Sequence, residues 1–229
     1  EKVFEIGPAY RAEKSHTRRH ITEFTSIDIE EAFATAEDVM KVAEELIYHV
    51  CKTVREKCRE ELRILKHEVD LPSLPMKRLT YDRIIEELRE RDVKIEWGED
   101  IPTAAYRILG EIHPYFYFIT DWPTKLKPFY IKPRDDNPEI SEGFDLMWSW
   151  IEIASGGTRI HKKDLLIKRL KEQGLHVESF KYHLQTFDYG MPPHAGWAIG
   201  LERLVMMLTG VKNIREVVLF PRDRFRLIP

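Results

Sequence analysis

Alternating apolar and polar positions predict two strands near the start of the chain. Residues 3–6 and residues 20–30 alternate with the period of two that is typical of a half-buried strand. The polar stretch between them, residues 12–19, predicts the loop of a long hairpin. Further short strands are expected over residues 115–121, 127–132, 142–154 and 196–199, and Ser155-Gly156-Gly157 is expected to close the third of these.

Apolar positions at helical spacing predict the remaining elements. The spacing is clearest over residues 37–60, and Thr80 is placed to cap a helix over residues 81–91. Three further helices are expected, over residues 161–173 with Gly174 just after the last turn, over residues 178–186, and from the end of the last strand to about Leu208. Long hairpins that alternate with separate helices favour an α+β fold with an antiparallel sheet over a doubly wound fold.

Composition narrows the class of protein. The chain has 229 residues, of which 43% are hydrophobic and 33% charged, and its net charge of -3 argues against a strongly basic protein that coats nucleic acid. Cys51 and Cys58, expected on one helix face, are too few for a disulfide framework or a zinc site and fit a reducing, cytoplasmic compartment. We see no signal peptide and no apolar run of roughly 18 residues that would span a membrane. Because the chain begins at Glu1 rather than methionine, we expect a trimmed chain.

The first candidate site lies on the predicted hairpin. A period of two would place Arg11 and Glu13 on one face of the first strand, with Arg19 and His20 across the loop. Arginine is suited to bidentate contact with a carboxylate or a phosphate, and Phe24 offers a ring on which a base can stack. The same residues also fit a charged hairpin with surface ion pairs.

Two other stretches carry residues of similar chemistry. Asp145, Glu152 and Ser155 offer hard oxygen ligands for Mg²⁺, and Arg159 adds a cation just beyond them. Near the C-terminus, Gly196 and Gly200 would let a strand approach a ligand closely. Arg203 follows in the first turn of a helix, where the helix dipole favours an anion. A turn with a solvated arginine and a packed strand–helix junction are the alternative interpretations. No Walker motif is present.

Taken together, these stretches resemble the class II aminoacyl-tRNA synthetases, specifically aspartyl-tRNA synthetases of the archaeal and eukaryotic type. Residues 4–13 with residues 19–24 resemble the second signature motif, and Gly200-Leu201-Glu202-Arg203 resembles the third. The ending Leu219-Phe220-Pro221-Arg222-Asp223 through Pro229 is similar to the ending of the aspartate enzymes. Two positions depart from the family pattern, because Trp150 and Ala198 stand where glycine is common.

The resemblance implies ATP-dependent activation of L-aspartate and transfer of the aspartyl group to tRNA(Asp). It implies that Arg11 and Arg203 are catalytic and that Mg²⁺ is bound by Glu152 and Ser155 with Asp145 nearby. Aspartate would be bound by Arg11, Ser155 and Arg159. ATP would be bound by Arg11, Ala12, Glu13, Arg19, His20, Ile21, Phe24, Glu152, Gly200, Leu201, Glu202 and Arg203. Residues 14–18 would face the acceptor end of the tRNA.

The resemblance also implies what accompanies this chain in the family. Residues 1–229 correspond to the part of one catalytic domain that holds motifs 2 and 3; motif 1 and the anticodon-binding domain are absent, so we expect a truncated chain that is inactive or weak alone. The full-length enzyme would be a homodimer. An asparaginyl-tRNA synthetase, a synthetase-derived asparagine synthetase and a non-catalytic binding module are the alternatives.

Overall fold

A computed structural model of the chain describes residues 1–14 and 16–228. Its centre is a seven-stranded sheet in the order β1-β2-β7-β6-β5-β4-β3. Neighbouring strands are antiparallel except for β3 and β4, which pair in parallel. The strands are β1 (Lys2–Tyr10), β2 (Glu23–Ala32), β3 (Lys77–Thr80), β4 (Phe116–Thr120), β5 (Gly143–Trp148), β6 (Ile151–Thr158) and β7 (His194–Gly200). The predicted α+β fold with a mainly antiparallel sheet is therefore confirmed.

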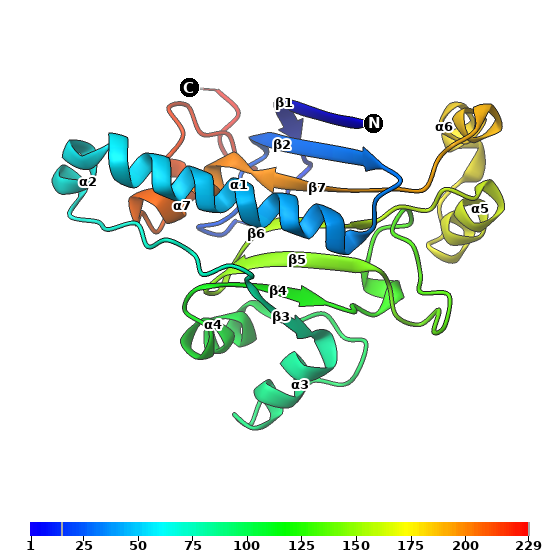
Figure 1. Cartoon of the computed structure of the whole chain (residues 1–229), viewed down its shortest axis with the longest axis horizontal. Helices are drawn as coiled ribbons and strands as arrows, with labels where there is room; N and C mark the ends of the chain where they lie inside the picture. The colour runs from blue at the N-terminus through cyan, green and yellow to red at the C-terminus, as the bar shows by residue number, and fades with distance from the viewer. Residues whose placement is uncertain (15, 229) are drawn as a thin grey trace.

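Helices cover parts of both faces of the sheet (Figure 1). The α-helices are α1 (Ala36–Lys57), α2 (Arg59–Leu65), α3 (Tyr81–Arg89), α4 (Thr103–Ile112), α5 (Lys163–Glu172), α6 (Lys181–Thr186) and α7 (Leu201–Thr209). Short 3-10 turns occupy Thr124–Leu126, Val177–Phe180, Phe187–Tyr189 and Ile214–Glu216. Among the described residues, no helix is both long enough and apolar enough to cross a membrane.

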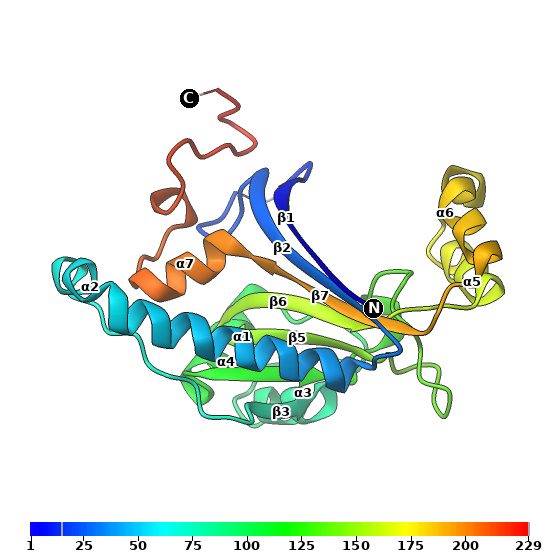
Figure 2. The same cartoon turned by 45° about the horizontal axis from the view of Figure 1, so that its top comes forward.

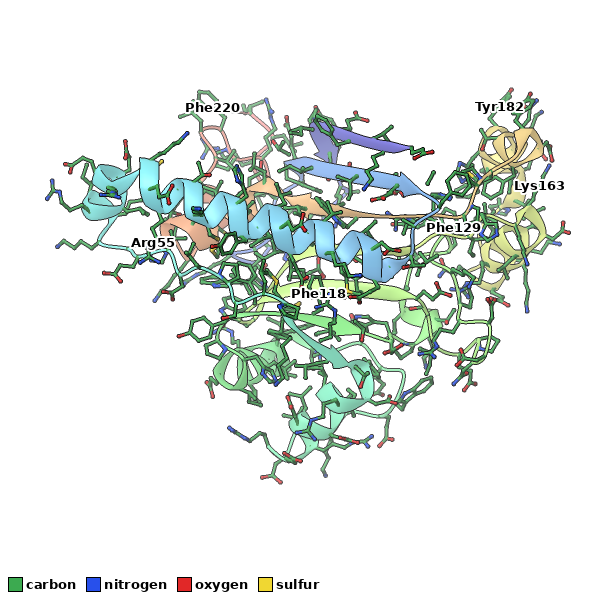
Figure 3. All side chains as sticks on the ribbon, in the orientation of Figure 1. Arg55, Phe118, Phe129, Lys163, Tyr182 and Phe220 are labelled. Atoms are coloured by element: carbon green, nitrogen blue, oxygen red, sulfur yellow. The ribbon has the colours of Figure 1, made fainter. Side chains whose placement is uncertain are left out.

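The long helix α1 packs across one face of the sheet. Its apolar stripe, with Ile47 fully buried, meets Phe118, Phe144 and Trp197 of the strands in the largest apolar cluster. The indole of Trp197 also donates a hydrogen bond to the carbonyl oxygen of Val39 in α1 (2.9 Å). Phe118 lies beneath α1 in the view with side chains (Figure 3). These contacts fix α1 and leave the opposite face of the central strands for other partners.

A second apolar cluster covers only one end of the opposite face. There α3 and α4 pack on Tyr117 and Ile119 of β4, the neighbours of Phe118, because successive strand residues point to opposite faces. A third, smaller cluster joins α5 and α6 into a lobe beside the sheet, in which the ring of Phe129 meets that of Phe180 (Figure 2). The opposite face over β2, β7 and β6 lies outside both clusters.

Several sequence predictions need correction. The strand expected over 127–132 is wrong, since only an isolated bridge joins Ile131 to Arg159. Ser155-Gly156-Gly157 does not close a strand but lies inside β6. The helix expected over 37–60 ends at Lys57, and Cys58 lies at its junction with α2. Neither β3 nor α4 was expected.

Other boundaries agree closely. The Thr80 side chain accepts a hydrogen bond from the Arg83 amide, which confirms it as the cap of α3, and this helix ends at Arg89. Gly174 follows the end of α5 with a positive φ of 68°, as a residue after a helix C-cap requires. The segment 178–186 is split between a 3-10 turn and α6.

Candidate active site

A cavity of about 410 Å³ opens on the sheet face opposite α1. Trp197 points toward α1, so the next residue, Ala198, faces the cavity. The register places Asp28, Ala198, Ser155 and Asp145 in one row across four strands. Three of these four residues line the cavity, so its floor combines the polar side chains of Ser155 and Asp145 with the methyl group of Ala198.

The connection between β1 and β2 forms one wall of the cavity. Because β1 ends at Tyr10, Arg11 and Glu13 follow the strand and do not share one of its faces, which corrects the argument from a period of two. The guanidinium of Arg11 lies 5.0 Å from the centre of the Phe24 ring on β2, and both side chains line the cavity. Within the predicted loop 14–18, Ser15 lies outside the described residues.

Arg203 enters the cavity from the first turn of α7. Gly200 is the N-cap residue of this helix, and a Cβ there would meet nothing within 4 Å. The Arg203 guanidinium donates both to the backbone carbonyl of Glu152 and to its carboxylate, each at 3.0 Å. The preceding residue, Glu202, has a structural role as well, because its carboxylate accepts hydrogen bonds from the Thr25 amide of β2 (2.9 and 3.0 Å).

A β-bulge explains how two predicted metal ligands reach the same cavity. Residues 152 and 155 would face opposite sides of a regular strand, since they are three apart. The pairing of β5 with β6 shifts between Leu146 and Met147, which leaves Ile153 as an extra residue. Glu152 and Ser155 therefore both line the cavity.

Asp145, the third predicted metal ligand, is held by a buried lysine. Both of its carboxylate oxygens accept from Lys127 Nζ at 2.7 Å, and each side chain is less than a tenth exposed. The Lys127 ammonium also lies 4.5 Å from the centre of the Trp122 ring. Burial raises the pKa of the Asp145 carboxyl, and the adjacent ammonium opposes that rise.

Arg159 is paired with a carboxylate that the sequence did not indicate. Its Nη2 lies 2.7 Å from Glu30 Oε1, and its guanidinium lies 5.3 Å from the centre of the Tyr130 ring. Gly196 faces Glu30 in the register, and a Cβ on it would lie 2.4 Å from the Glu30 carboxyl carbon and 2.2 Å from the Ile29 carbonyl oxygen. Gly196 thus makes room for this ion pair and for β2, whereas the sequence suggested that it makes room for a ligand.

The end of the cavity near Arg19 and Arg203 carries several close cations. Burial, followed by repulsion from Arg203, lowers the pKa of the His20 imidazole below its ordinary value. The same two causes, in the same order, lower the pKa of Arg19. The Arg19 guanidinium donates to the Trp150 carbonyl oxygen (3.1 Å) and to the Thr103 hydroxyl (3.3 Å). Because these cations repel one another, an anion bound among them would reduce the repulsion.

Residues from the end of the chain hold the β1–β2 connection in place. Arg215 donates to the carbonyl oxygen of Thr17 (2.9 Å) and to Asp223 (2.7 Å). The Ile214 amide donates to the carbonyl oxygen of Arg18 (2.8 Å), and Arg222 pairs with Glu23. We call these C-terminal contacts, made by residues 214–224, the C-terminal clasp. The predicted terminal residue, Pro229, lies outside the described residues.

The donor set fits a magnesium ion that also takes oxygens from a bound phosphate. Among the described residues, no group of three or more His, Cys, Asp or Glu side chains could hold a metal ion by itself. The Glu152 carboxylate is 43% exposed and lies in the cavity with the Ser155 hydroxyl, so these two can supply oxygens to an ion that enters with a phosphate chain. Asp145, held by Lys127 through both oxygens, lies behind them.

Most of the predicted site residues meet at this cavity. Its lining includes Arg11, Glu13, Arg19, His20, Ile21, Phe24, Asp145, Glu152, Ser155, Arg159, Gly200, Glu202 and Arg203. Ala12 and Leu201 are not among the lining residues. The sequence analysis did not identify Glu30, Lys127, Tyr106 or Trp122. The only available signal for Lys127 was its place in a segment with several aromatic residues, and it did not suggest a role.

Comparison with known proteins agrees with this geometry. Residues 1–224 match the family described as tRNA synthetases class II (D, K and N). The chain is 51% identical over 229 residues to the aspartate–tRNA(Asp/Asn) ligases of Methanothermobacter thermautotrophicus and Archaeoglobus fulgidus. These alignments cover 100% of this chain but 52% and 53% of the relatives, so the chain spans about half the length of the curated relatives it matches.

Solved structures give the same result for the fold. An aspartyl-tRNA synthetase from Entamoeba histolytica is 38% identical with a TM-score of 0.93, and the match covers 100% of this chain and 49% of that one. An asparaginyl-tRNA synthetase from Pyrococcus horikoshii, complexed with asparaginyl-adenylate, is 34% identical with a TM-score of 0.94, covering 100% and 54%. The cavity and both sets of comparisons lead to one conclusion: the chain belongs to the class II tRNA synthetases of the aspartate, lysine and asparagine group.

Proposed function

We propose that this chain is the catalytic part of an aspartate–tRNA ligase. The observation that carries the proposal is one cavity in which Arg11, Arg203 and Glu152 lie together with Arg159. Arg11, Arg203 and Glu152 suit a nucleotide with its metal ion, and Arg159 suits the carboxylate side chain of aspartate. The names of the relatives, aspartate–tRNA(Asp/Asn) ligases at about half identity over the whole chain, support the same activity.

In the first proposed step, the α-carboxylate of aspartate attacks the α-phosphate of ATP. A bond forms between the carboxylate oxygen and phosphorus, the bond to the bridging oxygen breaks, and pyrophosphate leaves. No general base is needed, because the attacking carboxylate is already ionised. The protein has to align the reactants and stabilise the negative charge that develops. Arg11, which lines this cavity, would contact both the aspartate carboxylate and the α-phosphate.

The rest of the nucleotide is assigned to the residues around Arg11. Arg203 would hold the far phosphates, while Glu13, Arg19 and His20 lie against ATP and Phe24 offers its ring to adenine. Gly200, Ile21 and Glu202 complete the wall. Glu152 and Ser155 would hold Mg²⁺, which supplies neutralisation of the phosphate charge when it is bound.

Selection of aspartate is assigned to Arg159. Its guanidinium can form a bidentate, charge-assisted contact with the side-chain carboxylate. An asparagine amide would lose this contact and leave the arginine poorly paired, a difference of a few kcal/mol. Glu30 fixes the orientation of Arg159 from the opposite side.

In the second proposed step, a hydroxyl at the 3′ end of tRNA(Asp) attacks the aspartyl carbonyl, and AMP leaves. The β1–β2 connection would face the acceptor end. We propose that the region 1–229 is one catalytic domain of a longer homodimeric enzyme, whose other parts bind the anticodon and complete the amino-acid pocket. The alternative, an asparagine-specific enzyme, has structural support in the match to the Pyrococcus horikoshii asparaginyl-tRNA synthetase.

The test is amino-acid-dependent exchange of pyrophosphate into ATP. The 229-residue chain is assayed alone and joined to the N-terminal half of the Methanothermobacter relative, with aspartate and asparagine compared. We expect exchange with aspartate by the joined protein, and little or none by the chain alone. Exchange with asparagine only would replace aspartate by asparagine in the proposal, and exchange with neither amino acid would contradict it. Robust activity of the chain alone would refute the expectation that it is an incomplete part.

A further inference from the structure

The turn between β5 and β6 holds Trp150 in a fixed position beside the cavity. Its first residue, Ser149, has a positive φ of 53°, and its amide donates to the Tyr115 carbonyl oxygen (3.1 Å). The Tyr117 hydroxyl donates to the Ser149 carbonyl oxygen (3.0 Å). A Cβ on Gly110 of α4 would lie 2.9 Å from the Trp150 amide nitrogen, so α4 packs directly on this turn.

Two arginines from different parts of the chain meet the Trp150 ring. Arg107 lies one helical turn before Gly110 in α4, and its guanidinium carbon is 5.0 Å from the centre of the indole ring. The guanidinium carbon of Arg19, from the β1–β2 connection, is 4.7 Å from the same centre. The Trp150 carbonyl oxygen and the Thr103 hydroxyl accept hydrogen bonds from Arg19, at 3.1 and 3.3 Å. The Arg19 side chain thus makes three contacts, with the ring and the carbonyl oxygen of Trp150 and with the hydroxyl of Thr103.

Electrostatics alone would move Arg19 away from this position. Arg203 and Arg107 both repel its charge, and Glu152 is the nearby acid that attracts it. An indole ring attracts a cation through its negative face, and a backbone carbonyl adds a directed acceptor. The contacts with Trp150 therefore offset the repulsion of Arg19 by the other two arginines. Without them, the phosphate chain itself would have to draw Arg19 into position.

Building on the proposed function, we propose that Trp150 is a positioning residue that keeps Arg19 directed into the nucleotide cavity before a phosphate group arrives. Helix α4 supports this arrangement, because Arg107 and Gly110 pack on Trp150 and Thr103 accepts a hydrogen bond from Arg19. Without it, Arg19 would move away from Arg203 and Arg107, and nucleotide binding would have to bring Arg19 back. The role affects ATP more than aspartate, because Arg159 lies at the other end of the cavity and makes none of these contacts.

A pair of substitutions separates this role from simple packing. Trp150→Leu and Trp150→Phe both keep an apolar side chain, but only phenylalanine keeps a ring face for Arg19. In the 229-residue chain, we measure amide hydrogen exchange over residues 16–20 without ligand, and the Kd for ATP. Trp150→Leu should speed the exchange and raise the Kd about three- to tenfold, the range expected for losing a cation–π contact. Trp150→Phe should lie near the unsubstituted chain in both measurements.

A matched control is Trp97→Leu, because Trp97 lies outside the cavity and donates to Asp82 (2.8 Å). It should leave both measurements unchanged. Equal behaviour of Trp150→Leu and Trp150→Phe, or unchanged exchange in Trp150→Leu, would overturn the positioning role. If the unsubstituted chain binds no ATP, the Kd is measured in the joined protein of the exchange assay. Absence of ATP binding there contradicts the proposed function, whereas the exchange measurement still decides whether Trp150 orders the Arg19 segment.

Discussion

The two ends of the cavity differ in how their cations are balanced. At the amino-acid end, Arg159 is paired with Glu30 and Lys127 with Asp145. At the end that we propose for the nucleotide, Arg203 pairs with the Glu152 carboxylate, which also attracts Arg19. The first end thus has one acid for each of its two cations, whereas at the second end the Glu152 carboxylate is 43% exposed and open to a further cation. The difference suits a small amino acid at one end and a polyanionic nucleotide with its metal ion at the other.

The largest effect is a loss of stability expected for Lys127→Met, which removes the partner of Asp145 at the amino-acid end. Removing one partner of a buried ion pair leaves an uncompensated charge and destabilises a protein by about 3–5 kcal/mol. Urea denaturation should show this loss. Lys163→Met is the control, because Lys163 forms an exposed pair with Asp188 and should contribute about 1 kcal/mol or less (Figure 3). Equal effects of the two substitutions would mean that the Lys127 pair is not effectively buried.

Arg203→Ala breaks the nucleotide end instead. It removes charge-assisted hydrogen bonds, each of which typically contributes about 1.5–3 kcal/mol, so the Kd for a non-hydrolysable aspartyl-adenylate analogue should rise about 10- to 100-fold. Calorimetric titration measures the change. Arg203→Lys keeps the positive charge but loses the planar guanidinium, so its Kd should lie between those of the unsubstituted chain and Arg203→Ala. Unchanged affinity in Arg203→Ala would remove Arg203 from the proposed site.

Glu30→Gln tests whether the ion pair between Glu30 and Arg159 affects the KM for aspartate. The neutral side chain still fits over Gly196 but holds the guanidinium less firmly, so the KM for aspartate should rise about tenfold while the KM for ATP stays constant. The assay is pyrophosphate exchange with the joined protein. Glu31→Gln, which alters only the surface pair with Lys2, should leave both constants unchanged. A parallel rise in both constants would indicate general damage to the site.

The smallest effect is a shift in the titration of His20. Its lowered pKa means that the folded chain protonates this imidazole less readily than the unfolded chain does, so stability falls as the pH drops below the ordinary histidine pKa of about 6.5. Removal of Arg203 or binding of ATP should raise the pKa of His20, because each makes the local field less positive. NMR titration of the imidazole measures it. A value at or above 6.5 in the ligand-free chain would contradict the crowding of cations.

Local spacing predicted those parts of the molecule that depend on near neighbours in sequence. The β1–β2 hairpin, the Thr80 cap and the helix that begins after Gly200 follow from alternation, capping and glycine placement. Residues such as Arg11 and Arg203 could be proposed because each belongs to a short motif. Their meeting in one cavity then depended on the family resemblance, and the structure confirms that they line it together.

The features that were missed depend on distant residues. Glu30 and Arg159 are 129 positions apart, and no periodicity indicates that Gly196 makes space for their contact. The apolar segment 127–132 was read as a strand, but Phe129 packs on Phe180 in the α5–α6 lobe. Helix α4 begins after Pro102 without a side-chain cap, so its start carries little local signal. The bulge at Ile153 follows from the pairing of two strands.

The C-terminal clasp has a consequence for the order in which the site is completed. Arg215 is separated from Thr17 by 198 positions, so a ribosome makes the β1–β2 connection long before the residues that secure it. During most of synthesis, a nascent chain can form the hairpin but cannot fasten its loop. Contacts of such high sequence separation also form late in refolding, because a long loop must close first. The wall of the cavity made by the β1–β2 connection should therefore be among the last parts that a newly made chain completes, well after its sheet is formed.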